Sequence, residues 1–333
     1  MFSWNEKIWS ALRKRIDRLP HAVLIQGPAG VGKLALAEQL ATRLLCEAPT
    51  SGGESCGQCE GCRWVRSGNH PDLRRIEPEA LSNQRSEDDA PKTERIGRGT
   101  RAAKPSLEIK IDQIRELSDF LYVGSHRGRR RVAIVHPAEA MNVHAANALL
   151  KGLEEPPSGA MFLLVSHQAA RLPPTILSRC VTVAVPRPAE EAALAWLEGQ
   201  GQSRDMAKWL AFAGGSPRAA LEYASGERGA LTKPILDAIA RGHPESIPEA
   251  TDRETLDAMA EVLQKHAIDR VAALLAGRPI YGTEAPAGKG GVSAVEWARF
   301  ARSMGRARSL TSHPVNPRLF SAELLLMFNK LLI

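Results

Sequence analysis

Three features that would assign a protein class at once are missing from this sequence. Only five of its 333 residues are cysteine, which is too few for a disulfide scaffold in a chain of this size. No uninterrupted apolar run approaches the ~18 residues that suggest a membrane span. The first residues, M-F-S-W-N-E-K-I-W, show no charged segment followed by an apolar one, which a secretory signal would have. We therefore expect a cytoplasmic protein with no membrane partner.

The composition is that of an ordinary globular protein. Apolar residues make up 44% of the chain and charged residues 24%, and a length of 333 residues allows two or three domains with cores of their own. The formal net charge is +7 and the pI is about 9.3. A basic balance is compatible with attraction to nucleic acid, but it is equally compatible with an ordinary basic protein.

A short apolar run at Val23–Ile25 leads into a glycine-rich turn, and a helical pattern follows at once. This order predicts a strand, a phosphate-binding loop and a helix. The loop glycines turn backbone N–H groups inward, and the helix N-terminus adds its positive dipole end. At the position after the loop lysine, Ser or Thr would ligate magnesium, but this chain has Leu34. The residues that match the G-x-x-x-x-G-K spacing are Gly27, Gly30, Gly32 and Lys33.

A second predicted strand, Val132–Val135, bears on hydrolysis. In an active nucleotide hydrolase of this type it ends in Asp-Glu, where the Asp supports magnesium and the Glu activates water. Here the strand is followed by His136-Pro137, and the nearest acidic residue, Glu139, comes two positions after Pro137. Two positions that serve magnesium are thus missing, which favours loss of the chemistry over coincidence.

Four of the five cysteines follow the loop helix closely. Four thiolates within seventeen residues suit one tetrahedral zinc ion, and because they leave no open coordination position, the site would be structural. The alternatives are unligated thiols or one catalytic cysteine. The C-x2-C-x2-C part is the stronger signal, and the first cysteine is added for its proximity. The predicted ligands are Cys46, Cys56, Cys59 and Cys62.

Several local structures are also predicted. Apolar residues at helical spacing predict a helix from Ser3 to about Leu19, and alternation predicts a strand at Leu107–Ile111 followed by a helix capped by Asp112. Residues 78–105 have almost no large apolar side chains and are expected to form an exposed insertion. The basic run Arg127–Arg131 is expected to be a solvated turn, with contact to DNA or an acidic partner as the alternative. Ser216 and Pro217 are expected at a helix start, as N-cap and first helical residue.

Two motifs then give the chain a family resemblance. They are A-N-A-L-L-K-G-L-E-E-P-P from Ala146 to Pro157 and I-L-S-R-C from Ile176 to Cys180. With L-P-H-A-V-L-I-Q-G at Leu19–Gly27, the four-cysteine module and N-H-P-D at Asn69–Asp72, they resemble the bacterial clamp-loader subunits of the AAA+ superfamily. The resemblance runs from about Arg18 to Leu221.

The resemblance implies a fold and a domain order. An α/β AAA+ phosphate-loop domain with a parallel sheet would span residues 1–186, with the zinc module at 46–62 and the flexible insertion at 78–105. A small helical lid would follow at 187–228, and an all-helical collar domain that oligomerises at 229–333.

The resemblance also implies roles for individual residues. The Ser-Arg-Cys arginine of these proteins is presented to the ATP site of a neighbouring subunit, which makes Arg179 the expected catalytic residue in trans; a surface salt bridge is the alternative. Ser166 matches the position that senses the γ-phosphate in motor subunits. Arg218 matches the lid arginine that contacts nucleotide, the alternative being a surface or interdomain contact. Cys180 is expected to be a small buried residue.

Within this family, motor subunits keep the magnesium-supporting residues and a stator subunit does not. With Leu34 and His136-Pro137 the chain resembles the stator: a scaffold beside a motor subunit and the delta subunit in a hetero-oligomeric ring that loads a sliding clamp onto primed DNA. ATP binding without hydrolysis stays open. The rival is an active motor-type ATPase that tolerates Leu34 and recruits His136 or Glu139. A zinc module that reads DNA is a weaker third hypothesis, because it has little basic or aromatic surface beyond Arg63, Trp64 and Arg66.

Overall fold

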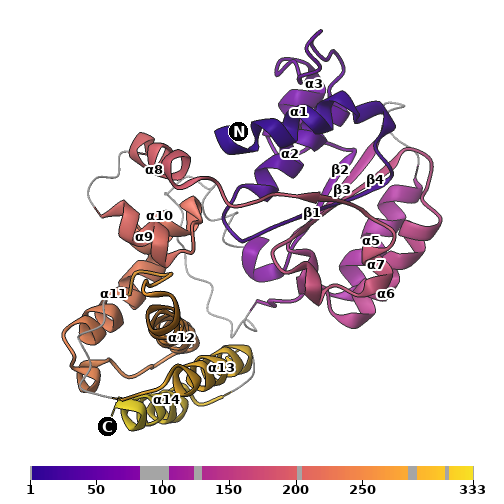
Figure 1. Cartoon of the computed structure of the whole chain (residues 1–333). Coiled ribbons are helices and arrows are strands. Elements are labelled where there is room, and N and C mark those ends of the chain that lie inside the picture. The colour runs from indigo at the N-terminus through magenta and orange to yellow at the C-terminus, as the bar shows by residue number, and fades with distance from the viewer. Residues whose placement is uncertain are drawn as a thin grey trace, which may run out of the picture. The chain divides into compact units, whose positions relative to one another are not determined.

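The computed structural model describes residues 2–82, 105–123, 130–200, 205–283, 291–311 and 315–332. The chain divides into two compact units, Met1–Arg187 and Pro188–Ile333. Both units are shown in Figure 1. Most of the predicted insertion, residues 83–104, lies outside the described residues, as do Arg127 and Arg129 of the basic run. Among the helices described, none combines the length and the apolar character that a membrane span needs.

The first unit is built on a parallel sheet with strand order β2-β3-β4-β1-β5. Its strands are short, and β1, β3 and β4 are almost wholly apolar and buried, as suits a parallel sheet covered on both faces. Leu24 of β1 pairs with Leu164 of β4, which in turn pairs with Val135 of β3. The strands are β1 (Ala22–Gln26), β2 (Leu73–Ile76), β3 (Arg131–Val135), β4 (Ala160–Ser166) and β5 (Val181–Ala184).

Alternate residues of β1 feed two cores, one on each face of the sheet. Val23 and Ile25 belong to the cluster under α1 and α2, whereas Ala22 and Leu24 belong to the cluster under α5 and α6. Figure 1 shows these two helical layers with the strands between them. The helices of this unit are η1 (Ser3–Asn5), α1 (Glu6–Lys14), η2 (Ile16–Arg18), α2 (Lys33–Leu45), α3 (Glu60–Arg66), α5 (Ile111–Tyr122), η3 (Ala138–Ala140), α6 (Val143–Glu154), η4 (Ala169–Arg171) and α7 (Pro174–Leu177).

Three local predictions for this unit are wrong in part. The expected helix from Ser3 to Leu19 is three pieces, because α1 ends at Lys14 and Arg15 takes non-helical angles. Leu107–Ile111 forms no strand: Ile109 makes one bridge to Met141, and the helix begins at Ile111 because the Gln113 side chain accepts the N–H of Lys110.

Arg131, the last residue of the basic run, is not in a solvated turn. It begins β3, only 4% of its surface is exposed, and its guanidinium lies 3.4 Å from Asp72 and over the ring of Phe120. A buried guanidinium needs such partners to offset its lost hydration.

The second unit is helical throughout its described residues. The start of helix α10 differs from the prediction in one respect. Pro217 is its first helical residue, as predicted, but the buried hydroxyl of Ser216 makes no capping hydrogen bond. The helices are α8 (Glu190–Gly199), α9 (Met206–Phe212), α10 (Pro217–Ser225), α11 (Glu227–Ala240), η5 (Pro244–Ser246), α12 (Arg253–Ala276), α13 (Ala294–Leu310) and α14 (Pro317–Leu332).

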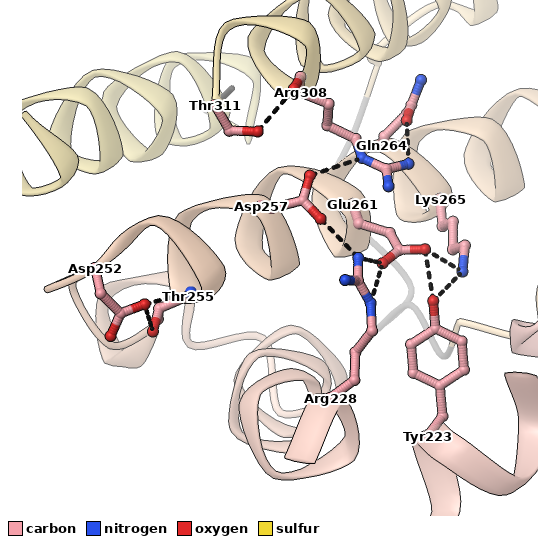
Figure 2. Close-up of polar contacts among 10 residues, drawn as sticks. All are labelled: Tyr223, Arg228, Asp252, Thr255, Asp257, Glu261, Gln264, Lys265, Arg308 and Thr311. Atoms are coloured by element: carbon pink, nitrogen blue, oxygen red, sulfur yellow. Dashed lines mark hydrogen bonds and ion pairs between the residues drawn. The ribbon is translucent and has the colours of Figure 1, made fainter. Parts of the chain in front are cut away.

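A buried ionic network joins four of these helices (Figure 2). Glu261 of α12, 5% exposed, accepts hydrogen bonds from the Tyr223 hydroxyl at 2.6 Å, from Lys265 at 2.8 Å and from Arg228 Nε at 3.1 Å. Burial alone would raise the pKa of Glu261, but the charges of Lys265 and Arg228 outweigh it and lower the pKa to about 2. We call this set the Glu261 network: Tyr223, Arg228, Asp257, Glu261, Lys265 and Arg308.

Candidate functional site

The phosphate loop has the predicted strand–loop–helix setting between β1 and α2. Gly27, at φ +153°, passes so close to Val185 that a Cβ atom would lie 2.0 Å from its carbonyl oxygen. Gly32, at φ +90°, is the N-cap of α2. Both conformations are open to glycine and strained for other residues, so the loop requires glycine at these two positions.

Lys33 is turned into this loop. Only 2% of its surface is exposed, and its ammonium group donates a hydrogen bond to the carbonyl of Pro28. Burial lowers the pKa of Lys33 to about 8, and the negative charge of Glu139 partly opposes that shift. The lysine therefore already has a partner inside its own loop.

The N-terminal segment covers the loop, which the sequence did not reveal. The Trp4 indole and the Asn5 amide both donate to the Val31 carbonyl, at 3.0 and 3.2 Å. The Phe2 ring lies against Gly32, where an added Cβ would approach it to 2.3 Å. Gly32 is thus required twice, by its backbone angles and by this contact.

Neither position that would serve magnesium carries a ligand. Leu34 is half-buried and packs against the apolar cluster beneath α1 and α2. At the end of β3 stand His136 and Pro137, joined by a cis peptide bond. Carboxylate, hydroxyl and water oxygens are what Mg²⁺ requires, and these side chains supply none.

Glu139 is held at the carboxyl ends of β3 and β4. Its Oε1 accepts the N–H groups of His167 at 2.9 Å and Gln168 at 3.2 Å. Ser166, fully buried, ends β4 and accepts the Gln168 N–H at 3.2 Å. Burial, with the charge of Lys33, lowers the pKa of His167 to about 4, so this imidazole is neutral at pH 7. Glu139 is thus the carboxylate that is electrostatically coupled to Lys33, and a second one, Glu77, lies 3.5 Å from His136 Nδ1.

The four cysteines converge. Their sulfur atoms all lie within 4.8 Å of one another, and two of the pairs, Cys56–Cys62 and Cys46–Cys59, are 4.0 Å apart. Backbone N–H groups point at the sulfurs, from Cys56 to Cys46 at 3.3 Å and from Cys59 to Cys56 at 3.3 Å. N–H donation from Gln58 and Cys59 lowers the pKa of Cys56 to about 6.

This donor set fits a tetrahedral metal ion. Zinc–sulfur bonds of about 2.3 Å place sulfurs roughly 3.8 Å apart, close to the 4.0 Å that separates the sulfurs of Cys56 and Cys62 and those of Cys46 and Cys59. Gly61 allows the close turn, since a Cβ there would lie 2.6 Å from the Leu45 carbonyl. Four cysteines this close could hold a metal such as zinc. Cys180 is not with them; it is half-buried against the other core cluster, and burial raises the pKa of its thiol to about 11.

Arg179 follows α7 and is held by its own chain. Its guanidinium lies 2.6 Å from Glu154 at the end of α6 and donates to the Thr175 carbonyl at 2.8 Å and to Ser178 Oγ at 3.2 Å. Its side chain keeps 34% of its exposure. The alternative given for this residue, a surface salt bridge, is therefore present, yet the side chain stays accessible.

Arg218 belongs to the other unit, as the second residue of α10, and is exposed. The structure thus brings together Gly27, Gly32, Lys33 and Glu139 in one place and the four cysteines in another. Arg179 and Arg218 remain separate predictions.

The parallel sheet, the glycine-rich loop between β1 and α2, and the helical second unit define the class as an AAA+ phosphate-loop protein, as the sequence predicted. Residues 4–189 match the family described as "DNA polymerase III, delta subunit". This is more than half of the chain, which therefore belongs to that family.

Among curated proteins, the chain is similar to DNA polymerase III subunit delta' of Pseudomonas aeruginosa. The two are 42% identical over 65% of this chain and 59% of that protein, so the chain spans about 60% of this relative's length. It is also 35% identical to DNA polymerase III subunit tau of Escherichia coli, over 53% of this chain and 24% of tau.

Among solved structures, a gamma subunit-related protein of DNA polymerase III from Thermotoga maritima shares the fold. The TM-score is 0.51 at 17% identity, over 97% of this chain and 98% of that one.

Proposed function

We propose that this chain is the delta-prime stator of a bacterial DNA polymerase III clamp loader, a subunit that hydrolyses no ATP itself. The observation that carries the proposal is Leu34, which is half-buried and packs against the apolar cluster at the position where a magnesium-ligating hydroxyl would stand. Without the metal, phosphoryl transfer loses its main charge neutralisation. The identity to delta' relatives supports the same assignment.

The chemistry would be supplied to a neighbour. In this proposal Arg179 leaves Glu154 and places its guanidinium on the γ-phosphate bound by an adjacent motor subunit. There it would stabilise the charge that spreads over the transferring group. An accessible side chain with a solvent-screened ion pair can make that exchange at little cost, since exposed pairs contribute only about 0–1 kcal/mol.

The remaining parts would serve assembly. Residues 187–228 are the proposed lid and 229–333 the proposed collar, through which the chain would join the motor and delta subunits in a hetero-oligomeric ring. The sliding clamp and primed DNA would be engaged through that complex. Cys46, Cys56, Cys59 and Cys62 would hold a structural zinc ion, which fixes the loop after α2 and leaves no open position for catalysis.

One observation favours the rival ATPase. Glu139 is coupled to Lys33, and its Oε2 is buried without a hydrogen bond among the described residues. A carboxylate there could orient a water molecule. Its other oxygen is occupied by two backbone N–H groups, and the other acid near the end of β3, Glu77, lies against His136. Because neither Leu34 nor Pro137 offers an oxygen ligand for magnesium, the stator is the better-supported function.

The test is ATP turnover by the purified chain with magnesium, alongside a motor subunit as positive control and Lys33→Ala and Glu139→Gln as variants. We expect no turnover above that of Lys33→Ala. Hydrolysis that both substitutions abolish would replace the stator with the motor-type ATPase. Binding of a fluorescent ATP analogue, measured separately, reports whether the retained loop holds nucleotide without hydrolysing it.

A further inference from the structure

A groove of about 750 Å³ runs between α1 and β5, and the residues that line it belong neither to the phosphate loop nor to the cysteine cluster. Its floor is apolar and includes Ile8, Leu12, Leu19 and Val183. β5 is the last strand of the sheet order, paired with β1 alone among the described strands. The groove therefore combines an apolar floor with an open strand edge.

The backbone of β5 offers hydrogen bonds along that edge. Val185 donates its N–H to Gln26 of β1 at 2.8 Å, and Val183 pairs with Ile25. Because successive residues of a strand turn to opposite sides, Thr182 and Ala184 direct their N–H and C=O groups away from β1. Both residues are exposed, so an added strand could bond to them.

The charged side chains at the rim of the groove are all positive. Lys7, Lys14, Arg15 and Arg18 line the groove, and among the residues that the structure describes no acidic side chain lines it. All four are exposed. The rim favours an occupant with negative charges, and the valine-containing floor favours one with apolar side chains between them.

We propose that this groove binds an extended, acidic segment of a partner protein, which adds as a strand to the free edge of β5. Alternate side chains of that segment would enter the apolar floor beside Val181 and Val183, while its acidic residues meet Arg15 and Arg18. Strand addition of this kind takes affinity from the main chain and specificity from alternate side chains. A nucleic-acid backbone would satisfy the rim, but it would use neither the floor nor the strand edge.

The probe is a short fluorescein-labelled peptide with the repeat Val-Ser-Glu-Ser, in which valine and glutamate alternate on the one face of the strand that turns to the groove; it is titrated against the full chain by anisotropy. The same peptide with lysine in place of glutamate is the charge control, and labelled oligothymidylate tests the nucleic-acid alternative. We expect Arg15→Glu with Arg18→Glu to weaken peptide binding by about tenfold or more. Arg302→Glu with Arg306→Glu on α13, an equal change of charge on exposed residues, should leave it unchanged.

The strand edge is tested separately. Thr182→Pro removes one outward N–H, and edge strands tolerate proline; Thr182→Val keeps the N–H and is its control. We expect the proline variant to lose binding and the valine variant to keep it. Should the proline variant not fold, slowed hydrogen exchange of the Thr182 and Ala184 amides in the bound wild type carries the same information.

The proposal is overturned if the acidic peptide does not bind, or if it binds the charge-reversed groove as well as the wild type. It is also overturned if oligothymidylate binds in an Arg15- and Arg18-dependent way that Thr182→Pro leaves intact, because the groove would then be a phosphate-backbone site.

Discussion

Replacing Glu261 by Gln removes one charge from the Glu261 network while keeping the shape of the side chain. Arg228 would retain Asp257 at 2.7 Å, but Lys265 would lose its carboxylate partner in a place where its own pKa is already lowered, chiefly by burial. The pKa of Glu261 falls from 4.5 to about 2, which corresponds to about 3 kcal/mol. Breaking a buried pair on one side costs about 3–5 kcal/mol in other proteins.

We therefore expect Glu261→Gln to lower the stability of the α10–α12 region by about 3 kcal/mol at pH 7. Hydrogen exchange of amides in these helices measures this locally, with urea unfolding of the full chain beside it. Glu323→Gln, on the exposed side of α14, is the matched control and should change little.

The pH dependence has a defined sign. Because the folded pKa of Glu261 is lowered, its contribution is present above the ordinary pKa of 4.5 and is lost as pH falls toward about 2. The difference between wild type and Glu261→Gln should shrink across that window. Equal exchange rates in the two proteins at pH 7, or a difference that grows in acid, would refute the reasoning.

Three further outcomes are expected. Metal analysis should find about one zinc per chain, lost in Cys59→Ser with Cys62→Ser; a metal-free wild type of full stability would contradict the metal site. Gly32→Ala should destabilise the chain by about 1–3 kcal/mol through strain, and Phe2→Ala should relieve part of that cost; a purely additive double mutant would mean that Phe2 does not contact Gly32 in solution. Glu154→Gln should free Arg179 and raise turnover in the reconstituted complex by no more than about fivefold, because both side chains are partly exposed. A loss of turnover comparable to that of Arg179→Ala would instead make Glu154 a positioning residue.

What the sequence could predict was local. The glycines and Lys33 form one continuous loop, and the four cysteines lie within seventeen residues, so spacing alone placed them. The fold class, which the family resemblance implied, is confirmed by the parallel sheet and the helical second unit.

The missed features depend on contacts between distant residues. Phe2 meets Gly32 only when the N-terminus folds over the loop, and Arg131 meets Asp72 only once β2 and β3 are paired. The hydrogen bond from the Lys110 N–H to the Gln113 side chain joins residues only three positions apart, so the sequence could have predicted it. The alternating pattern of Leu107–Ile111 favoured a strand instead. The Glu261 network includes a direct contact between residues 51 positions apart, Asp257 and Arg308. No pattern of apolar and polar residues in the sequence predicts such a contact.

The central claim is that this chain supplies Arg179 to a neighbour and hydrolyses no ATP itself. The most direct measurement reconstitutes it with a motor subunit whose own finger arginine has been replaced, so that turnover depends on Arg179 alone. We expect Arg179→Ala to reduce that turnover by a factor on the order of 10³ or more. Arg171→Ala, an exposed arginine nearby, should leave it intact, and the chain alone should show none. Undiminished turnover with Arg179→Ala, or hydrolysis by this chain on its own, would contradict the account.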